Sequence, residues 1–314
     1  MTTIPSEHRA TALGSASVAE QRLARLADEP LESAGPASGF FKGTARSLRD
    51  LAAYRELLSL LVRRELKARY KDSTLGFLWT LIRPLTILVV YYVAIGKFLG
   101  AERSIPDFAI YIFTGLLAWQ LFQEIVSAGT GAIVSNAGLI KKVYLPREVF
   151  PLSVVGGALF TLVTQLAVLA LALVVSGSVP TGPRLLFAPL GLAVLLVYAT
   201  ALALVLSAVN VYLRDVQYLV EIALTVLFWA SPIVYSWELV QSAIPESMQQ
   251  LYLANPVTAA ILAMQRAFWV AGTDEPYPPD LTVRLLLMLG IGLVLLWGAQ
   301  RVFARLEANF AQEL

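Results

Sequence analysis

The sequence has no cysteine and only one histidine, His8, which lies in a polar N-terminal stretch. The absence of cysteine excludes disulfide bonds, thiolate metal sites, iron–sulfur clusters and cysteine nucleophiles. The single histidine nearly excludes imidazole-based metal sites and catalysis by a Ser-His pair. Charged residues are scarce as well, because they make up 15% of the 314 residues, compared with about 25% in an average soluble domain.

Apolar residues are abundant instead. The residue types AVILMFWYC make up 57% of the chain, and the mean hydropathy is +0.68. Too few polar side chains remain to cover a water-soluble globule, and a transmembrane helix needs about 20 mostly apolar residues. The candidate spans are about 75–99, 108–133, 149–175, 185–211, 218–234 and 281–303. We therefore expect an all-α integral membrane protein with six transmembrane helices.

A further apolar stretch, 251–270, precedes the last expected span and is interrupted by Asn255, Pro256 and Arg266. Interrupted helices can enter the bilayer and return where protein or water satisfies their free backbone groups. The same stretch can also form a short helical hairpin on the extracellular surface. The sequence leaves both interpretations open.

The distribution of Lys and Arg predicts the orientation. Residues 1–75 hold 12 of the 24 basic residues, and the loops that follow the second and fourth spans and the C-terminal tail bring that side to 18. The opposite side carries five. The richer side should be cytoplasmic, which places both termini inside. The N-terminus lacks a charged region followed by an apolar one, so we expect no cleavable signal peptide.

The sequence divides into three parts. Residues 1–50 are rich in Ala, Ser, Gly, Pro and mixed charge, which predicts a flexible cytoplasmic extension. Residues 51–73 combine apolar side chains at helical spacing with many cations, which predicts an amphipathic helix in the membrane interface. Its cations include Arg63, Arg64, Lys67, Arg69 and Lys71. This helix can be a simple anchor for the first span, or also the side wall of a gate or docking site. Residues 74–314 form the transmembrane domain.

Four runs of residues carry a family resemblance: RRELKARYKDSTLGFLWTLIRPL from Arg63, NAGLIKKVYLPREVFP from Asn136, NVYLRDVQYLVEIALTVLFWASPIVY from Asn210 and NPVTAAILAMQRAFW from Asn255. From about Leu51 to its end, the chain resembles the membrane subunit of ABC-2-type exporters that carry O-antigen, teichoic acid and related cell-surface polymers. The resemblance implies a permease of the bacterial plasma membrane. It also implies a homodimer that pairs with two ATP-binding cassette subunits and passes a lipid-linked glycan between its two copies.

The sequence contains no G-x-x-x-x-G-K-[ST] loop, which cradles nucleotide phosphates in many ATPases. We therefore expect no enzyme activity and no cofactor or metal ion bound by this chain, with ATP and Mg on the partner subunit. The expected partners are membrane lipids and the glycan, and no nucleic acid.

The segment between the second and third spans is the expected contact with the ATPase. Ser135 and Asn136 can cap a short helix over 137–145, which Pro146 helps to end. The resemblance implies that this is the coupling helix; the alternative is a solvated basic turn. The residues expected to contact the ATPase are Leu139, Ile140, Lys141, Lys142, Val143 and Tyr144.

Aromatic and ionisable residues in the spans are candidates for the substrate path. A sugar chain presents hydroxyl groups and apolar C–H faces, which aromatic side chains with polar tips suit. The candidates are Arg83, Tyr91, Tyr92, Trp119, Phe122, Glu124, Phe228 and Trp229. Aromatic belts at the membrane interface are the alternative interpretation. Arg83 can receive a substrate phosphate, reach lipid headgroups or pair with Glu221, and charges at bilayer depth should face protein or water.

Other function classes fit less well. An ABC exporter for a small molecule, drug or lipid remains the main alternative. A membrane-embedded glycosyl- or phosphotransferase needs acidic metal-binding clusters, which the sequence does not show. An ion-coupled carrier normally has matching repeat halves with broken helices, and the halves of this sequence do not match.

Overall fold

The computed structural model describes residues 49, 52–70, 78–142 and 145–314. These residues are helical or lie in connecting loops, and no β-strand occurs among them. The predicted extension over 1–50, apart from Arg49, lies outside the described residues, as do Lys71, Val143 and Tyr144. The predicted all-α class is therefore confirmed for the described part of the chain.

In the described part of the chain, five helices are long and apolar enough to cross a membrane. They are α4 (Trp79–Tyr91) with the π-helical turn η2 (Tyr92–Phe98), α5 (Phe108–Ser135), α7 (Val149–Val175), α8 (Phe187–Tyr212) with the preceding 3-10 turn η4 (Gly182–Leu186), and α13 (Leu281–Leu306). Each coincides closely with an expected span. A short 3-10 turn, η3 (Ala101–Arg103), joins the first two. The chain is an all-α integral membrane protein.

The fifth expected span, 218–234, is shorter than predicted. Helix α9 runs Val216–Trp229 and has 14 residues, which at 1.5 Å per residue gives about 21 Å, less than the roughly 30 Å hydrocarbon core. The chain then turns at Pro232. The Tyr111 hydroxyl of α5 donates to the carbonyls of Pro232 (3.1 Å) and Tyr235 (2.6 Å). The prediction that the helix continues to Val234 is therefore wrong, because side chains of other helices bind this turn.

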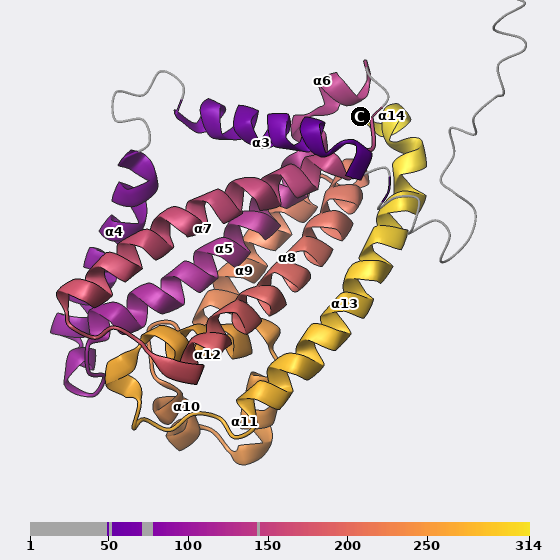
Figure 1. Ribbon diagram of the computed structural model, residues 1–314. Helices are drawn as coiled ribbons and strands as arrows, with labels where there is room; N and C mark the ends of the chain where they lie inside the picture. The colour runs from indigo at the N-terminus through magenta and orange to yellow at the C-terminus, as the bar shows by residue number, and fades with distance from the viewer. Residues whose placement is uncertain (1–48, 50–51, 71–77, 143–144) are drawn as a thin grey trace, which may run out of the picture. The chain divides into compact units, whose positions relative to one another are not determined.

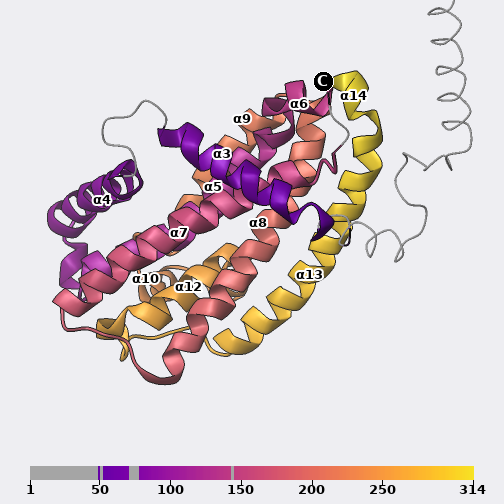
Figure 2. The ribbon, with the colours of Figure 1, turned by 45° about the horizontal axis from the view of Figure 1, so that its top comes forward.

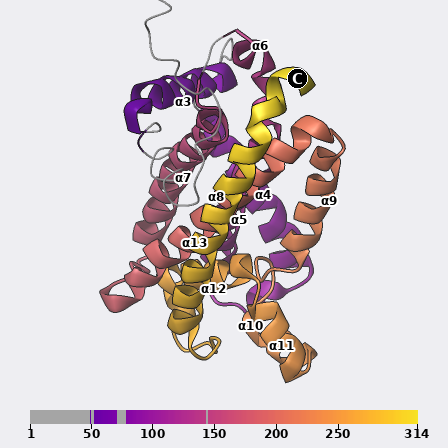
Figure 3. The ribbon, with the colours of Figure 1, turned by 90° about the vertical axis from the view of Figure 1, so that its right-hand side faces the viewer.

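Three short helices precede α13: α10 (Trp237–Ala243), α11 (Glu246–Leu253) and α12 (Pro256–Phe268), followed by the 3-10 turn η5 (Val270–Gly272). The Asn255 side chain caps α12 by accepting from the Val257 amide at 3.0 Å, and Pro256 occupies the first turn. Most of α12 is buried against α5 and α8. Residues 256–268 of the predicted stretch 251–270 therefore lie within the helix bundle, which excludes a surface hairpin for α12. Figure 3 shows α10 and α11 at the end of the bundle opposite α3 and α6.

Helix α5 is the centre of the bundle and packs most extensively on α8 and α7 (Figure 1). Small residues allow these backbones to approach closely. At Gly129 of α5, an added Cβ would lie only 2.6 Å from the Cβ of Ala203 on α8. Helix α13 approaches α8 in a similar way, because a Cβ at Gly292 would meet the Tyr198 ring at 2.7 Å.

Helix α3 (Arg55–Tyr70) lies across one end of the bundle, over α7 (Figure 2). Its apolar face packs inward, since Leu61 is only 5% exposed and Val62 lies against Gly156 of α7. Its cations Arg63, Arg64 and Lys67 are exposed on the outer face. A helix with an apolar inner face and a basic outer face is therefore present over 55–70, and its place in the membrane interface stays a prediction. The same end carries α6 (Ala137–Ile140), the 3-10 turn η6 (Glu307–Asn309) and α14 (Phe310–Glu313).

Candidate functional site

The segment between α5 and α7 begins with the single turn α6 and continues through a turn at Lys141 and Lys142. The predicted helix over 137–145 is thus only one turn long in its described part. Asn136 does not cap it with its side chain. The side-chain nitrogen of Asn136 instead donates to the Ala132 carbonyl of α5 at 2.8 Å, and its side-chain oxygen accepts from the Arg64 guanidinium of α3. The predicted cap is wrong because two neighbouring helices already use this side chain.

The expected partner contacts in this segment separate into two groups. Ile140 is 8% exposed and packs in an apolar cluster with residues of α3, α7, α8, α13 and α14, and Leu139 packs against the same cluster. The prediction that Ile140 fills a groove on a partner is therefore wrong, because the chain buries this side chain itself. Lys141 and Lys142 are exposed. The surface that this segment offers is consequently basic.

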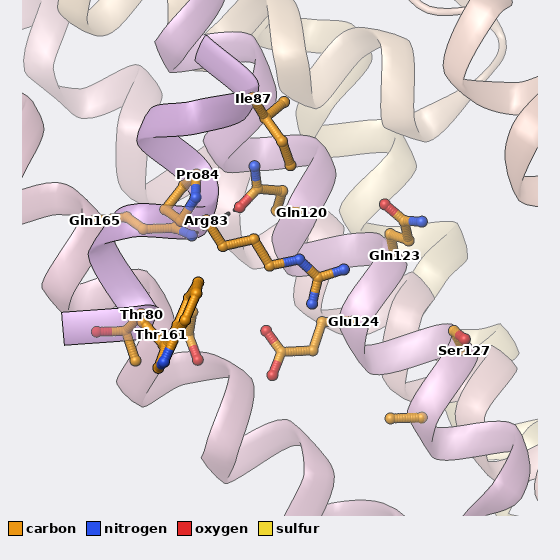
Figure 4. A pocket seen from close by; sticks show the side chains of 12 residues that line it. Thr80, Arg83, Pro84, Ile87, Gln120, Gln123, Glu124, Ser127, Thr161 and Gln165 are labelled. Carbon is orange, nitrogen blue, oxygen red and sulfur yellow. Dashed lines mark hydrogen bonds between the residues drawn. The ribbon is translucent and has the colours of Figure 1, made fainter. Parts of the chain in front are cut away.

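A polar cavity of about 560 Å³ lies between α4, α5 and α7, within three of the apolar spans (Figure 4). Its lining residues are Trp79, Thr80, Arg83, Pro84, Ile87, Gln120, Gln123, Glu124, Ser127, Ala128, Thr161 and Gln165. The sequence reasoning identified only Arg83 and Glu124 among them. The signal that it missed is the spacing of Gln120, Gln123, Glu124 and Ser127, which places four polar side chains on one face of α5.

The charged side chains of the cavity face each other. In Figure 4 the Arg83 guanidinium, from α4, points toward the Glu124 carboxylate of α5. Gln165 of α7 donates to the Gln120 side-chain oxygen at 2.8 Å, which links α7 to α5 at the wall of the cavity. Arg83 and Glu124 thus both line this polar space, which is the kind of surrounding that charges at bilayer depth need.

Five of the expected path residues form one series of ring contacts across α4, α5 and α9. Ring centroids are 5.8 Å apart for Tyr91 and Phe228, 5.5 Å for Trp119 and Phe228, 6.1 Å for Trp119 and Phe122, and 5.4 Å for Phe228 and Trp229. Trp119 and Phe122 are only 4% and 2% exposed, whereas Trp229 is 55% exposed. The buried rings hold three helices of the chain together, and Trp229 is the most exposed ring named in this series.

Tyr92 is separate from this series. Its ring stacks on Phe108 at 6.4 Å, near the end of the bundle where Lys97 and Glu102 form an ion pair at 2.8 Å. The hydrogen bond from Lys97 lowers the pKa of Glu102. The structure therefore groups Tyr92 with the loop between α4 and α5 rather than with Trp119 and Phe228.

At the same end, Arg184 holds the C-terminus of α12. Its guanidinium donates to the carbonyl of Arg266 (3.1 and 2.9 Å), to that of Trp269 (2.8 Å) and to the Thr273 hydroxyl (2.9 Å). These bonds satisfy carbonyls that the helix leaves free. They fix α12, whose Gln265 donates to the Pro232 carbonyl at 2.8 Å and so helps to hold the turn after α9.

The carboxyl groups of Glu275 and Glu238 approach each other near Thr273. Burial raises the pKa of Glu275, and the neighbouring Glu238 and Asp274 raise it further. In the described part of the chain, no group of three His, Cys, Asp or Glu side chains is placed to hold a metal ion.

Residues 56–269 match the ABC-2 type transporter family. The chain is 35% identical over 270 residues to an O-antigen export system permease protein of Myxococcus xanthus, which covers 86% of this chain and 99% of that protein. It is 27% identical over 259 residues to an O-antigen export system permease protein of Klebsiella pneumoniae, with 82% and 95% covered. A polysialic acid transport protein of Escherichia coli is 25% identical over 237 residues, with 74% and 89% covered. The chain therefore belongs to the ABC-2 type transporter family.

Proposed function

We propose that this chain is the transmembrane subunit of an ATP-driven exporter that moves a lipid-linked cell-surface polysaccharide out of a bacterial cell. The observation that carries the proposal is the similarity to an O-antigen export permease along 99% of that protein's length. The similarity to a polysialic acid transport protein points to the same class of cargo. Export of a small molecule, drug or lipid is the alternative within the same family.

The end of the bundle with α3, α6 and α14 faces the cytoplasm in this proposal. The supporting observation is the charge of that end. Helix α3, with its exposed cations, lies at the same end as α6, which the exposed Lys141 and Lys142 follow directly. Arg147 lies just before the start of α7. Cytoplasmic loops of membrane proteins carry an excess of Lys and Arg. Both termini are then inside the cell, and the cavity opens at the depth of the bilayer.

Two copies of the chain pair with two ATP-binding cassette subunits, which bind ATP and Mg. The chain has no phosphate-binding loop of its own, so the energy for export comes from another polypeptide. The exposed basic turn at Lys141 and Lys142 is the contact with that subunit. Because α5 and α7 flank this turn and run to the opposite end of the bundle, displacement of the turn tilts both helices as rigid bodies.

The glycan passes between the two copies, and the polar cavity lies beside its path. Amide and hydroxyl side chains such as Gln123, Ser127 and Thr161 suit the hydroxyl groups of sugars, and the outward ring of Trp229 suits their C–H faces. Arg83 is the cation available for an anionic group of the cargo. Trp119 and Phe122 do not contact the glycan in this proposal. Both rings are buried within the subunit, where they pack behind the residues that line the path.

Charge reversal at the basic turn tests the proposal. Lys141→Glu combined with Lys142→Glu should reduce recovery of the ATPase with the purified chain about tenfold, because two attractive contacts become repulsive. Export of polysaccharide in cells should fall with it. The matched control is Arg103→Glu, an exposed cation at the opposite end.

Each outcome has a defined meaning. Undiminished ATPase recovery with the double variant contradicts the basic contact. Deletion of the chain without any loss of surface polysaccharide contradicts the cargo, and an accompanying gain in sensitivity to a small toxic compound supports the alternative exporter.

A further inference from the structure

The chain bends after α13 and continues through two short helical turns. The residues 307–314, which we call the hook, form η6 and α14 and do not continue the line of α13 (Figure 1). The ring of Phe310 in the hook is fully buried. The hook lies outside the residues 56–269 that match the family, so the family match assigns it no part.

Aromatic contacts hold the hook against α8 and α13. The Phe310 ring meets the Phe303 ring at 5.6 Å and the Tyr212 ring at 6.2 Å, both edge-on. The Tyr212 hydroxyl donates to the Leu306 carbonyl at 2.7 Å. Buried edge-on pairs of this kind stabilise packing beyond the area that they bury, so the hook is firmly placed on two of the long helices.

The hook and α13 in turn hold the two residues that lead into α7. The Arg147 guanidinium lies over the Phe310 ring, 5.7 Å from its centroid. The next residue, Glu148, is 8% exposed and accepts from the Gln300 amide at 2.8 Å. The C-terminal end of the segment between α5 and α7 is therefore tied to α13 and the hook.

The N-terminal end of the same segment is tied to a different element, because the side-chain oxygen of Asn136 accepts a hydrogen bond from Arg64 of α3. Between the two ties, Ile140 packs in one apolar cluster with Leu61 of α3 and Phe310 of the hook. Figure 2 shows α6 lying between α3 and α14. Contacts with α3 on one side and with the hook on the other thus resist displacement of the exposed turn relative to the bundle.

We infer that the hook is a positioning element of the coupling turn, with Phe310 and Arg147 as its positioning residues. It holds the start of α7 in register with α8 and α13, so that displacement of the turn moves α7 instead of being absorbed by local rearrangement. The identity of the subunit that pushes on the turn rests on the proposed function. The mechanical claim concerns this chain alone.

Amide hydrogen exchange of the purified full chain tests the mechanical claim without any partner. The amides of residues 139–142 are bonded within the turn, to the carbonyls of Asn136, Ala137 and Leu139. Phe310→Ala should make these amides exchange about fivefold faster, because the turn opens locally more often, while α12 at the opposite end keeps its protection. Phe310→Leu should restore most of the protection. Phe98→Ala, which removes a ring that is 83% exposed, is the matched control.

A second variant guards against misfolding. Arg147→Gln removes the cation from the Phe310 ring and leaves the buried aromatic contacts intact, and it should accelerate exchange in the same amides about threefold. Unchanged exchange at residues 139–142 in both variants overturns the inference. Faster exchange over the whole bundle also overturns it, because the hook is then a general stabiliser.

Reconstitution with the ATPase provides the functional test. Phe310→Ala should leave ATPase recovery unchanged but lower the glycan exported per ATP hydrolysed about fivefold, and Phe310→Leu should restore the ratio. An unchanged ratio overturns the inference. If no ATPase binds even the unaltered chain, the proposed function fails, whereas the exchange experiment still decides the role of the hook.

Discussion

The close approach of α5 and α8 makes the sharpest quantitative prediction. A Cβ at Gly129 would stand 2.6 Å from the Ala203 Cβ and 3.3 Å from its Cα, whereas carbon atoms prefer separations of about 3.5–4.0 Å. Neither atom belongs to a flexible side chain, and Ala203 is fully buried. Gly129→Ala therefore requires the two helices to separate by about 1 Å.

Overpacking of this kind costs about 1–3 kcal/mol. The substitution also gains helix propensity, up to about 1 kcal/mol. Gly131→Ala in the same helix carries the same gain without the clash, since its nearest neighbours are the ends of Ser135 and Gln217, at 3.7 and 3.9 Å. The difference in stability between the two variants thus isolates the clash.

Thermal unfolding in detergent micelles is the assay. Gly129→Ala should unfold at a lower temperature than Gly131→Ala, and adding Ala203→Gly to Gly129→Ala should recover part of the loss, with a coupling energy of about 1 kcal/mol or more. If Gly129→Ala unfolds with or above Gly131→Ala, or if Ala203→Gly makes it worse, the two helices do not approach as closely as the structure shows.

Two further predictions concern the end of the bundle that carries Arg184 and Glu275. Arg184→Ala leaves helix-end carbonyls unbonded and should lower the unfolding temperature, by an amount equivalent to about 2–4 kcal/mol, whereas the exposed Arg103→Ala should not. Because the pKa of Glu275 is raised in the folded state, its contribution to stability is present at low pH and is lost as pH rises through the folded pKa. Glu275→Gln should remove this pH dependence and raise stability at neutral pH; an unchanged pH profile contradicts it.

The long helices could be predicted from the sequence because each is a nearly continuous apolar run. The amphipathic helix could be predicted as well, since its cations and leucines alternate with helical spacing. The end of α9 could not be predicted. The turn at Pro232 depends on bonds from Tyr111 and Gln265, which are far away in the sequence and meet it only in the folded bundle.

The candidate site could be predicted only in part, because some of its features also depend on contacts between residues far apart in the sequence. The charge of Lys141 and Lys142 is visible in the sequence, but the burial of Ile140 depends on α3 and the hook, which come from opposite ends of the chain. Of the residues that line the polar cavity, the sequence indicated only two as candidates. Arg83 and Glu124 stand out as charges in apolar spans, whereas Gln165 becomes significant only when α7 brings it to Gln120.

The central claim is that this chain conducts cargo only when an ATP-hydrolysing subunit drives it. The direct measurement is transfer of a labelled lipid-linked glycan across proteoliposomes that contain the purified chain, with and without the ATPase and ATP. The account predicts transfer only when the ATPase and ATP are both present. Transfer by the chain alone, at a rate that ATP hydrolysis does not change, would contradict it.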